Sequence, residues 1–103
     1  MRFEEVVALF ADLGSGELTS WVERGWVRPD ESGGEWEFRE IDVARVQLIR
    51  DLRREMEVTE ETVAMMLPLL DQLYELRSQM RRLLRALELQ PEPVRAAIWD
   101  ALA

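Results

Sequence analysis

The stretch VERGWVRPDESGGEWEFREID, residues 22–42, contains the signals that decide the fold. Gly25 is placed to end a helix, because glycine adopts the left-handed conformation that closes helices at little cost. The alternating stretches WVRP and EWEF flank DESGG, which predicts a two-stranded hairpin with its turn at Gly33-Gly34. A new helix is expected to begin near Asp42. The segment therefore predicts a helix, a hairpin and a second helix in succession.

The same stretch carries a charge that its shape does not explain. Seven acidic residues stand against Arg24, Arg28 and Arg39, which gives a local net charge of −4. The 103-residue chain as a whole has a net charge of −8. Because nucleic-acid phosphates attract cationic surfaces, this charge argues against a nucleic-acid partner. It is compatible with a basic protein partner.

Two short helices are expected before the hairpin, over residues 2–12 and 17–24, with a break at LGSGE. Ser15 or Gly16 supplies the start signal of the second helix. Each helix has one apolar face, formed by Phe3, Val6, Val7 and Phe10 in the first and by Leu18, Trp21 and Val22 in the second. Trp21 and Trp26 are expected in the core. Two short helices joined by a glycine-containing turn are typical of a helix-turn-helix.

Three further helices are expected after the hairpin. The third, at about 40–56, has one apolar side made of Ile41, Ala44, Leu48, Ile49, Leu52 and Met56. Thr59 is the expected N-cap of a fourth helix over roughly 60–89, which contains Pro68. A short terminal helix is expected over Val94–Leu102, with Val94, Ile98 and Leu102 facing inward. The expected domains are 1–58, the helical 59–89 and a C-terminal helix or tail, 90–103.

The long helix carries an apolar seam with alternating spacings of three and four residues, as in a coiled coil. Its members are Met66, Leu69, Leu73, Leu76, Met80, Leu83 and Leu87. The seam is compatible with a contact to the third helix or with self-association, and the length of the helix favours a dimer. Acids lie early in the helix and arginines late, so antiparallel pairing would place opposite charges together. Such exposed pairs contribute only about 0–1 kcal/mol each.

The composition excludes several classes of function. The chain has no Cys and no His, so thiolate metal sites, cysteine nucleophiles and histidine acid/base chemistry are absent. No glycine-rich phosphate loop or metal-ligand spacing occurs, and neighbouring acids on a helix do not face each other. We therefore expect a non-enzymatic protein without a cofactor or metal. No apolar run approaches a membrane span, and a cytoplasmic location is expected.

The order of elements resembles the MerR-type winged helix-turn-helix. The resemblance rests on LTSWVERGWVRP, on the short wing ending EWEF, and on IDVARVQLIRDLR followed by a long helix. The chain is similar, over about residues 3–88, to the CbpM chaperone-modulator branch in length, acidity, wing and Leu-rich final helix. The expected fold is mostly α, a MerR-like winged helix-turn-helix with a long C-terminal coiled-coil helix. The resemblance implies a homodimer that binds the J-domain of a CbpA/DnaJ-type co-chaperone and lowers its activity with DnaK.

A binding role for the acidic wing region has competing interpretations. The expected partner-binding residues are Glu23, Asp30, Glu31, Glu35, Trp36, Glu37 and Glu40. The same acids are compatible with a solvated face, and Trp36 with packing against the third helix as well as an interface anchor. The alternative functions are a DNA-binding transcriptional regulator and an adaptor for another protein. Nucleic-acid binding by the late arginines of the long helix is ranked below these.

Overall fold

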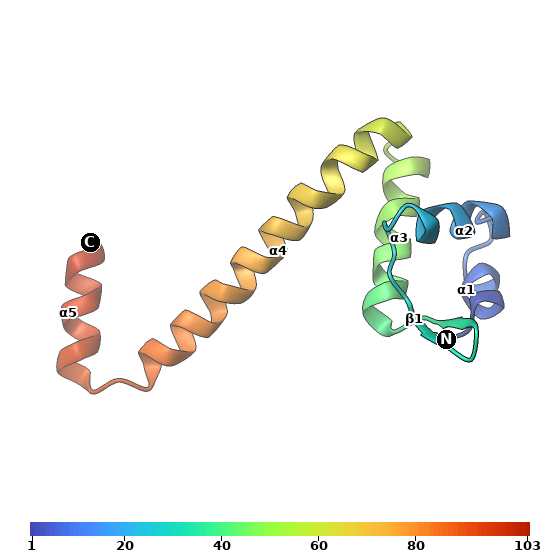
Figure 1. Cartoon of the computed structure of the whole chain (residues 1–103). Helices are drawn as coiled ribbons and strands as arrows, with labels where there is room; N and C mark the ends of the chain where they lie inside the picture. Colours follow the sequence, from blue (N-terminus) through green and yellow to red (C-terminus); the bar gives the residue numbers. More distant parts are fainter. The chain divides into compact units, whose positions relative to one another are not determined.

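The computed structural model describes residues 1–103 and is mostly helical, with one two-stranded sheet. The chain divides into two compact units, Met1–Leu67 and Pro68–Ala103. The elements, shown in Figure 1, are α1 (Phe3–Leu9), α2 (Ser15–Glu23), β1 (Asp30–Ser32), β2 (Glu35–Glu37), α3 (Glu40–Arg54), α4 (Glu60–Glu88) and α5 (Glu92–Leu102). This order confirms the predicted winged helix-turn-helix followed by a long helix.

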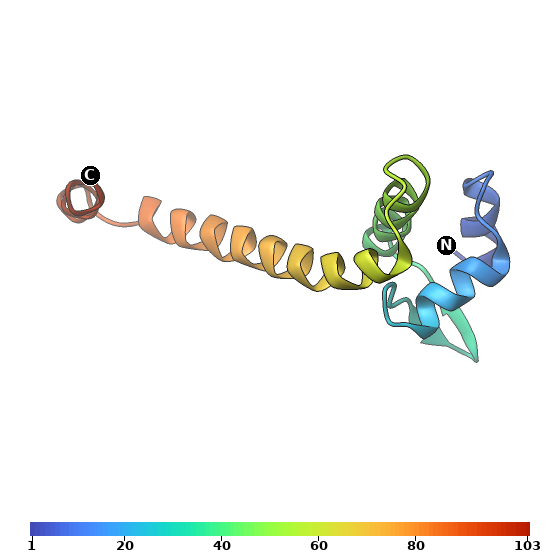
Figure 2. The same ribbon diagram turned by 90° about the horizontal axis from the view of Figure 1, so that it is seen from above.

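Helices α1 and α2 form the helix-turn-helix of the first unit and lie next to each other in two perpendicular views (Figures 1 and 2). The α1 helix ends at Leu9, earlier than predicted, and Leu13 in the connecting turn is buried. The α2 helix begins at Ser15, two residues earlier than predicted, with Gly14 in the N-cap position. The buried members of the two predicted apolar faces are Val6, Phe10, Leu18 and Trp21.

The α2 helix ends as predicted, with Gly25 in the left-handed region at φ 75°. The amide of Gly25 donates to the carbonyl of Val22 at 3.0 Å, and that of Trp26 donates to the carbonyl of Trp21 at 2.9 Å. This closed turn carries Trp26 and Val27 into the interior, where both are buried. The predicted first strand, WVRP, is therefore wrong, because its apolar residues fill the core directly after the helix cap instead of pairing in a sheet.

The hairpin that follows is shorter than predicted and lies farther along the chain. Strand β1 pairs with β2 in antiparallel register, with Asp30 opposite Glu37 and Glu31 opposite Trp36. The turn is at Gly33-Gly34, as predicted, and both glycines have positive φ, 61° and 80°. Two successive positive φ angles are what a tight two-residue hairpin turn requires, and glycine adopts them without strain.

The α3 helix spans Glu40–Arg54 and has a buried Asp42 in its first turn. The carboxylate of Asp42 accepts a 2.9 Å hydrogen bond from the amide of Arg39. Its buried apolar face consists of Val46, Ile49 and Leu52. The predicted face was wrong at Ala44, which is exposed, and at Ile41 and Met56, which are each 69% exposed. Burial follows the side of the helix that faces the core, and Val46, which the prediction omitted, is fully buried there.

The first unit holds the whole hydrophobic core. Side chains from α1, α2, the turn after α2, the end of the hairpin, α3 and the first turns of α4 meet in it. Its buried apolar residues are Val6, Phe10, Leu13, Leu18, Trp21, Trp26, Val27, Phe38, Val46, Ile49, Leu52, Val63 and Leu67. The prediction that Trp21 and Trp26 are core residues is confirmed.

The α4 helix starts as predicted, with the hydroxyl of Thr59 accepting a 3.2 Å hydrogen bond from the amide of Thr62. Val63 and Leu67 are its buried residues, and Pro68 lies inside the helix. The second unit, Pro68–Ala103, contains no buried residue. Val94, Ile98 and Leu102 are exposed, so the prediction that they face inward is wrong for the single chain. None of the five helices combines the length and apolarity that a membrane span requires.

Candidate functional site

The hairpin gathers five of the seven expected partner-binding residues. In its register Asp30 lies opposite Glu37, and Ser32 lies opposite Glu35. Because side chains alternate between the faces of a strand, Asp30, Glu35 and Glu37 share one face, and Glu31 and Trp36 share the other. The hairpin therefore presents carboxylates on both of its faces.

Each of these carboxylates has a partner within the chain. Glu35 pairs with Arg2, Glu37 with the amino group of Met1 at 3.0 Å, and Asp30 with Arg39 at 3.8 Å. The side chains of Glu35, Glu37 and Asp30 remain more than half exposed. Exposed ion pairs contribute about 0–1 kcal/mol, so an external cation can exchange with the internal one at little cost.

The other two expected residues lie outside the hairpin. Glu23 is the last residue of α2, and Glu40 is the first of α3. Glu40 lines a separate cleft of about 560 Å³, together with Leu9, Phe10, Ala11, Val43, Ala44, Gln47 and Arg50. The structure therefore does not bring all seven residues into one site.

The arginines close to these acids are engaged in internal contacts. Arg24 forms a 3.2 Å ion pair with Glu60 and stacks over the ring of Trp26 at 5.0 Å. Arg28 donates from Nε to the carbonyl of Gly25 at 3.3 Å. The two hydrogen bonds that its guanidinium makes to the buried Asp42 raise the pKa of Arg39 above its usual value. No basic residue occurs between Ser15 and Glu23 in α2.

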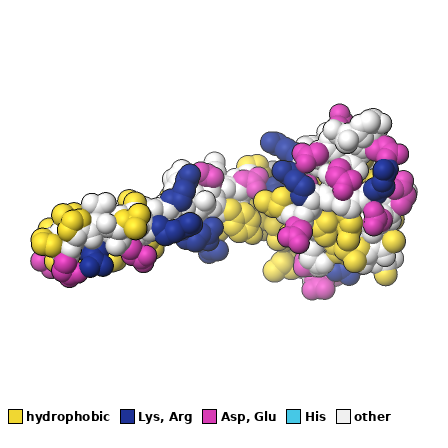
Figure 3. All heavy atoms as spheres, turned by 90° about the horizontal axis from the view of Figure 1, so that it is seen from below, with side chains coloured by type: hydrophobic (Ala, Val, Ile, Leu, Met, Phe, Trp, Pro, Cys, Tyr) yellow, Lys and Arg dark blue, Asp and Glu magenta, His cyan; other side chains and the backbone are white.

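The distribution of charge differs along the chain. Acidic side chains are spread over the visible face of the first unit in Figure 3, and arginines gather on α4. These are Arg77, Arg81, Arg82 and Arg85, all in the second unit. The helix-turn-helix and its wing are therefore the acidic part of the molecule, and the basic cluster lies on a different element.

Trp36 packs against α1, which contradicts the predicted contact with α3. Its ring centroid lies 5.9 Å from that of Phe3, with the planes inclined at 55°. Its indole Nε1 donates a 3.3 Å hydrogen bond to Glu31 across the hairpin. A backbone bridge between Arg2 and Glu37 holds the start of α1 beside the hairpin. Trp36 is half-buried by this contact and remains accessible at one side.

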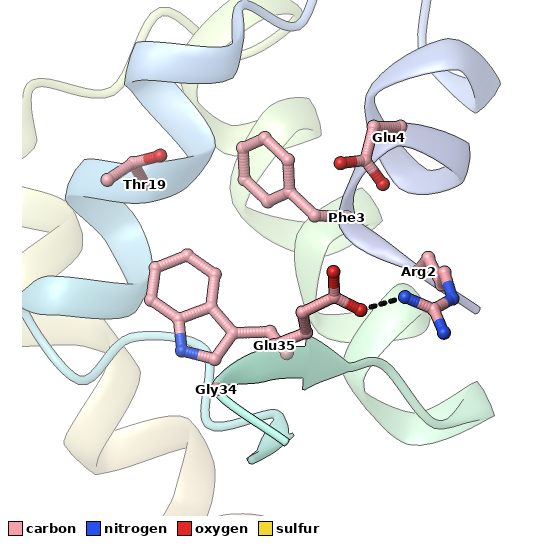
Figure 4. Close-up of a pocket in the computed structure, with 7 residues that line it drawn as sticks. Arg2, Phe3, Glu4, Thr19, Gly34 and Glu35 are labelled. Atoms are coloured by element: carbon pink, nitrogen blue, oxygen red, sulfur yellow. Dashed lines mark hydrogen bonds and ion pairs between the residues drawn. The ribbon is translucent and has the colours of Figure 1, made fainter. Parts of the chain in front are cut away.

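A cleft of about 290 Å³ opens beside this aromatic pair (Figure 4). It is lined by Arg2, Phe3, Glu4, Thr19, Gly34, Glu35 and Trp36. Of these, only Glu35 and Trp36 were expected from the sequence. Phe3 has the helical spacing of a core residue, and Glu4 and Thr19 carry no motif, so no local signal identifies them. The cleft combines two aromatic rings with two carboxylates.

The expected dimerisation residues lie along α4. Leu69, Leu76, Met80 and Leu83 are more than half exposed in the single chain, and Leu73 is 42% exposed. Met66 and Leu87 are half-buried. The seam is thus an exposed apolar stripe. No group of three or more acidic side chains is placed to hold a metal ion.

Comparison with known families identifies the fold. The sequence model of the family described as MerR HTH family regulatory protein matches residues 5–91. This range includes most of α1 and all of α2, the hairpin, α3 and α4. Neither a curated protein nor a solved structure shows significant similarity to the chain.

Proposed function

We propose that this chain, which belongs to the MerR family of helix-turn-helix regulatory proteins, acts by binding a protein instead of DNA. Its proposed partner is the J-domain of a CbpA/DnaJ-type co-chaperone, and its proposed effect is to lower co-chaperone activity with DnaK. The observation that carries the proposal is the acidic surface of the elements with which helix-turn-helix proteins contact DNA.

DNA recognition by this fold needs cations on the second helix of the motif and on the wing, because each phosphate contact neutralises a negative charge. In this chain α2 contains Glu17 and Glu23 and no basic residue. The hairpin adds four more acids, and Arg24, Arg28 and Arg39 are tied to Glu60, Gly25 and Asp42. A DNA backbone would be repelled from this surface.

A basic protein surface fits the same elements. J-domains carry a basic helix through which they engage DnaK, so an acidic protein that covers this helix would compete with DnaK. The resemblance to the CbpM branch supports this choice among basic partners. It rests on the Trp36–Phe38 wing, the acidity, the length of the chain and the Leu-rich long helix.

The proposal includes a homodimer formed through α4. The second unit has no buried residue and exposes Leu69, Leu76, Met80 and Leu83 on one seam. Isolated helices are marginal in water, and an amphipathic helix is stabilised chiefly by packing of its apolar face. Antiparallel pairing would bring the acids at Asp71 and Glu75 of one chain close to the late arginines of the other. The seven seam residues would form the interface.

The first experiment is calorimetric titration with the J-domain of the host's own CbpA-type protein, at low and at physiological salt. We expect saturable binding that weakens as salt rises, because salt screens exposed charges. Glu35→Lys combined with Glu37→Lys should weaken binding, and Glu88→Lys combined with Asp100→Lys, both outside the first unit, is the charge-matched control. Absence of heat at both salt concentrations would refute this partner.

The competing function is that of a DNA-binding transcriptional regulator, with which the family membership is also compatible. A gel shift with DNA from the host promoter region at moderate salt separates the two functions. Sequence-specific retardation, together with no response to the J-domain, would replace the protein-binding proposal with the regulator.

A further inference from the structure

We propose that the cleft between α1, α2 and the hairpin binds one cationic side chain, an arginine or a lysine, of a basic protein partner. This inference rests on the proposed function and adds to it a defined pocket on the acidic surface. The residues that form it are Phe3, Glu4, Thr19, Glu35 and Trp36 (Figure 4).

The aromatic wall of the cleft suits a cation. Phe3 and Trp36 lie 5.9 Å apart in an inclined arrangement, and both rings line the cavity. Aromatic faces attract guanidinium and ammonium groups, and tryptophan does so most strongly. The hydrogen bond from the Trp36 indole to Glu31 fixes the orientation of the ring, so little entropy is lost when a ligand contacts it.

The polar wall supplies the countercharge. Glu4 and Glu35 both line the cleft, and Glu4 has no ion pair within the chain. Glu35 already pairs with the guanidinium of Arg2, so the site accommodates such a group beside this carboxylate (Figure 4). Two carboxylates against one arginine leave a net negative charge. A second cation can therefore bind at Glu4, or it can displace Arg2 from Glu35, because an exposed ion pair of this kind contributes little free energy.

The size of the cleft favours a side chain over a larger ligand. At about 290 Å³ it lies at the lower limit of the roughly 300–1,000 Å³ that small-molecule sites occupy. The cleft also adjoins the acidic hairpin. When one cationic residue of the partner enters the cleft, neighbouring basic residues of the same partner can therefore pair with the carboxylates of Glu31 and Glu37. This arrangement is a central anchor with a charged rim.

The test is a titration of the full-length, ¹⁵N-labelled protein with N-acetyl-arginine amide, followed by NMR. The indole N–H signal of Trp36, assigned with Trp36→Phe, and the backbone amides of Thr19 and Glu35 should shift saturably. A dissociation constant on the order of 1 mM is expected for one side chain. N-acetyl-citrulline amide has the same shape without the charge, and it should produce little shift.

Two variants test the two walls. Trp36→Leu should weaken binding of the arginine amide about fivefold, because it removes the ring that a cation contacts. The double variant Glu4→Gln with Glu35→Gln should weaken it by a similar factor. Glu61→Gln, on an exposed carboxylate of α4 that is outside the cleft, should leave binding unchanged. Equal shifts with citrulline amide, or no shift with either ligand, would overturn the proposal.

These results do not depend on the choice of partner. If the arginine amide binds and the J-domain does not, the pocket stands and the proposed partner is wrong. If the J-domain binds equally well to the wild type and to Trp36→Leu, and the amide does not shift Trp36, the proposed function stands and the pocket is wrong.

Discussion

The two units of the chain differ both in how they hold their structure and in their charge. Met1–Leu67 contains the hydrophobic core, with sixteen acidic residues against eight arginines, and so carries a net charge of −8. Pro68–Ala103 contains no buried residue, and its five acids balance five arginines. The whole net charge of the protein thus lies in the unit that folds around its own core.

This difference indicates two kinds of contact. The first unit buries most of its apolar side chains in its own core and has an acidic surface, which suits a partner that is recognised by electrostatic attraction. The second is neutral and exposes apolar residues, which suits burial against another helix. The same difference predicts which substitutions affect folding, which affect association and which affect neither.

The largest effect is expected from Trp21→Ala. Trp21 is 2% exposed at the centre of the first unit, and removal of a buried tryptophan costs about 3–5 kcal/mol. This is a large part of the 5–15 kcal/mol that stabilises a typical domain, so urea unfolding followed by circular dichroism should begin at much lower urea. Trp99→Ala is the matched control, because Trp99 is 53% exposed on α5. Equal losses from both variants would contradict the assignment of the core to the first unit.

The second effect is expected from Leu76→Glu. A charge in the seam would be desolvated on pairing, so light scattering should report a mass that falls from a dimer to a monomer. Ser78→Glu adds the same charge on the opposite side of α4 and should leave the mass of the dimer unchanged. A monomeric wild type, or a dimer that persists in Leu76→Glu, would show that the seam is not the interface.

The smallest effect is expected from Asp12→Asn. Its hydrogen bond to Arg50, at 2.7 Å, lowers the pKa of Asp12 below its ordinary value of 3.8. The pair therefore contributes its full stabilisation of the folded state at pH values above 3.8. This stabilisation is lost as the pH falls through the lowered pKa of Asp12. Melting temperatures between pH 7 and 3 should decline slightly less steeply in Asp12→Asn than in the wild type. A steeper decline for Asp12→Asn would contradict the predicted sign.

Much of the fold could be predicted from local signals. Gly25 and Gly33-Gly34 were assigned correctly because their positions require positive φ, which glycine alone adopts freely. Thr59 was assigned correctly because a capping hydroxyl acts within one helical turn. The family match over residues 5–91 agrees with the order of elements that these signals indicate.

The errors arose where tertiary contacts decide. The stretch WVRP was predicted to form a strand, but both Trp26 and Val27 are buried in the core because the turn at Gly25 directs the chain inward. Ile41 and Ala44 have the spacing of a buried face but are exposed, because the core covers the neighbouring side of α3, which carries Val46. Spacing alone cannot report which side of a helix the core covers.

The cleft was beyond sequence reasoning for a similar reason. Phe3 and Trp36 are far apart in the sequence, and the bridge between Arg2 and Glu37 brings them together. No periodicity relates residues joined in this way. The charge of the wing could be predicted, but the cavity beside it depends on a long-range contact.

The continuity of α4 has a consequence for the kinetics of folding. Starting a helix is slow and unfavourable, with a nucleation constant on the order of 10⁻³, whereas extending one adds a hydrogen bond for each residue ordered. The Thr59 cap and the buried Val63 and Leu67 hold the first turns of α4 within the first unit. Once that unit has folded, the remainder of α4 needs only to propagate. The apolar seam would then form on an existing template, and the order of events would be folding of the first unit, extension of the helix, and association.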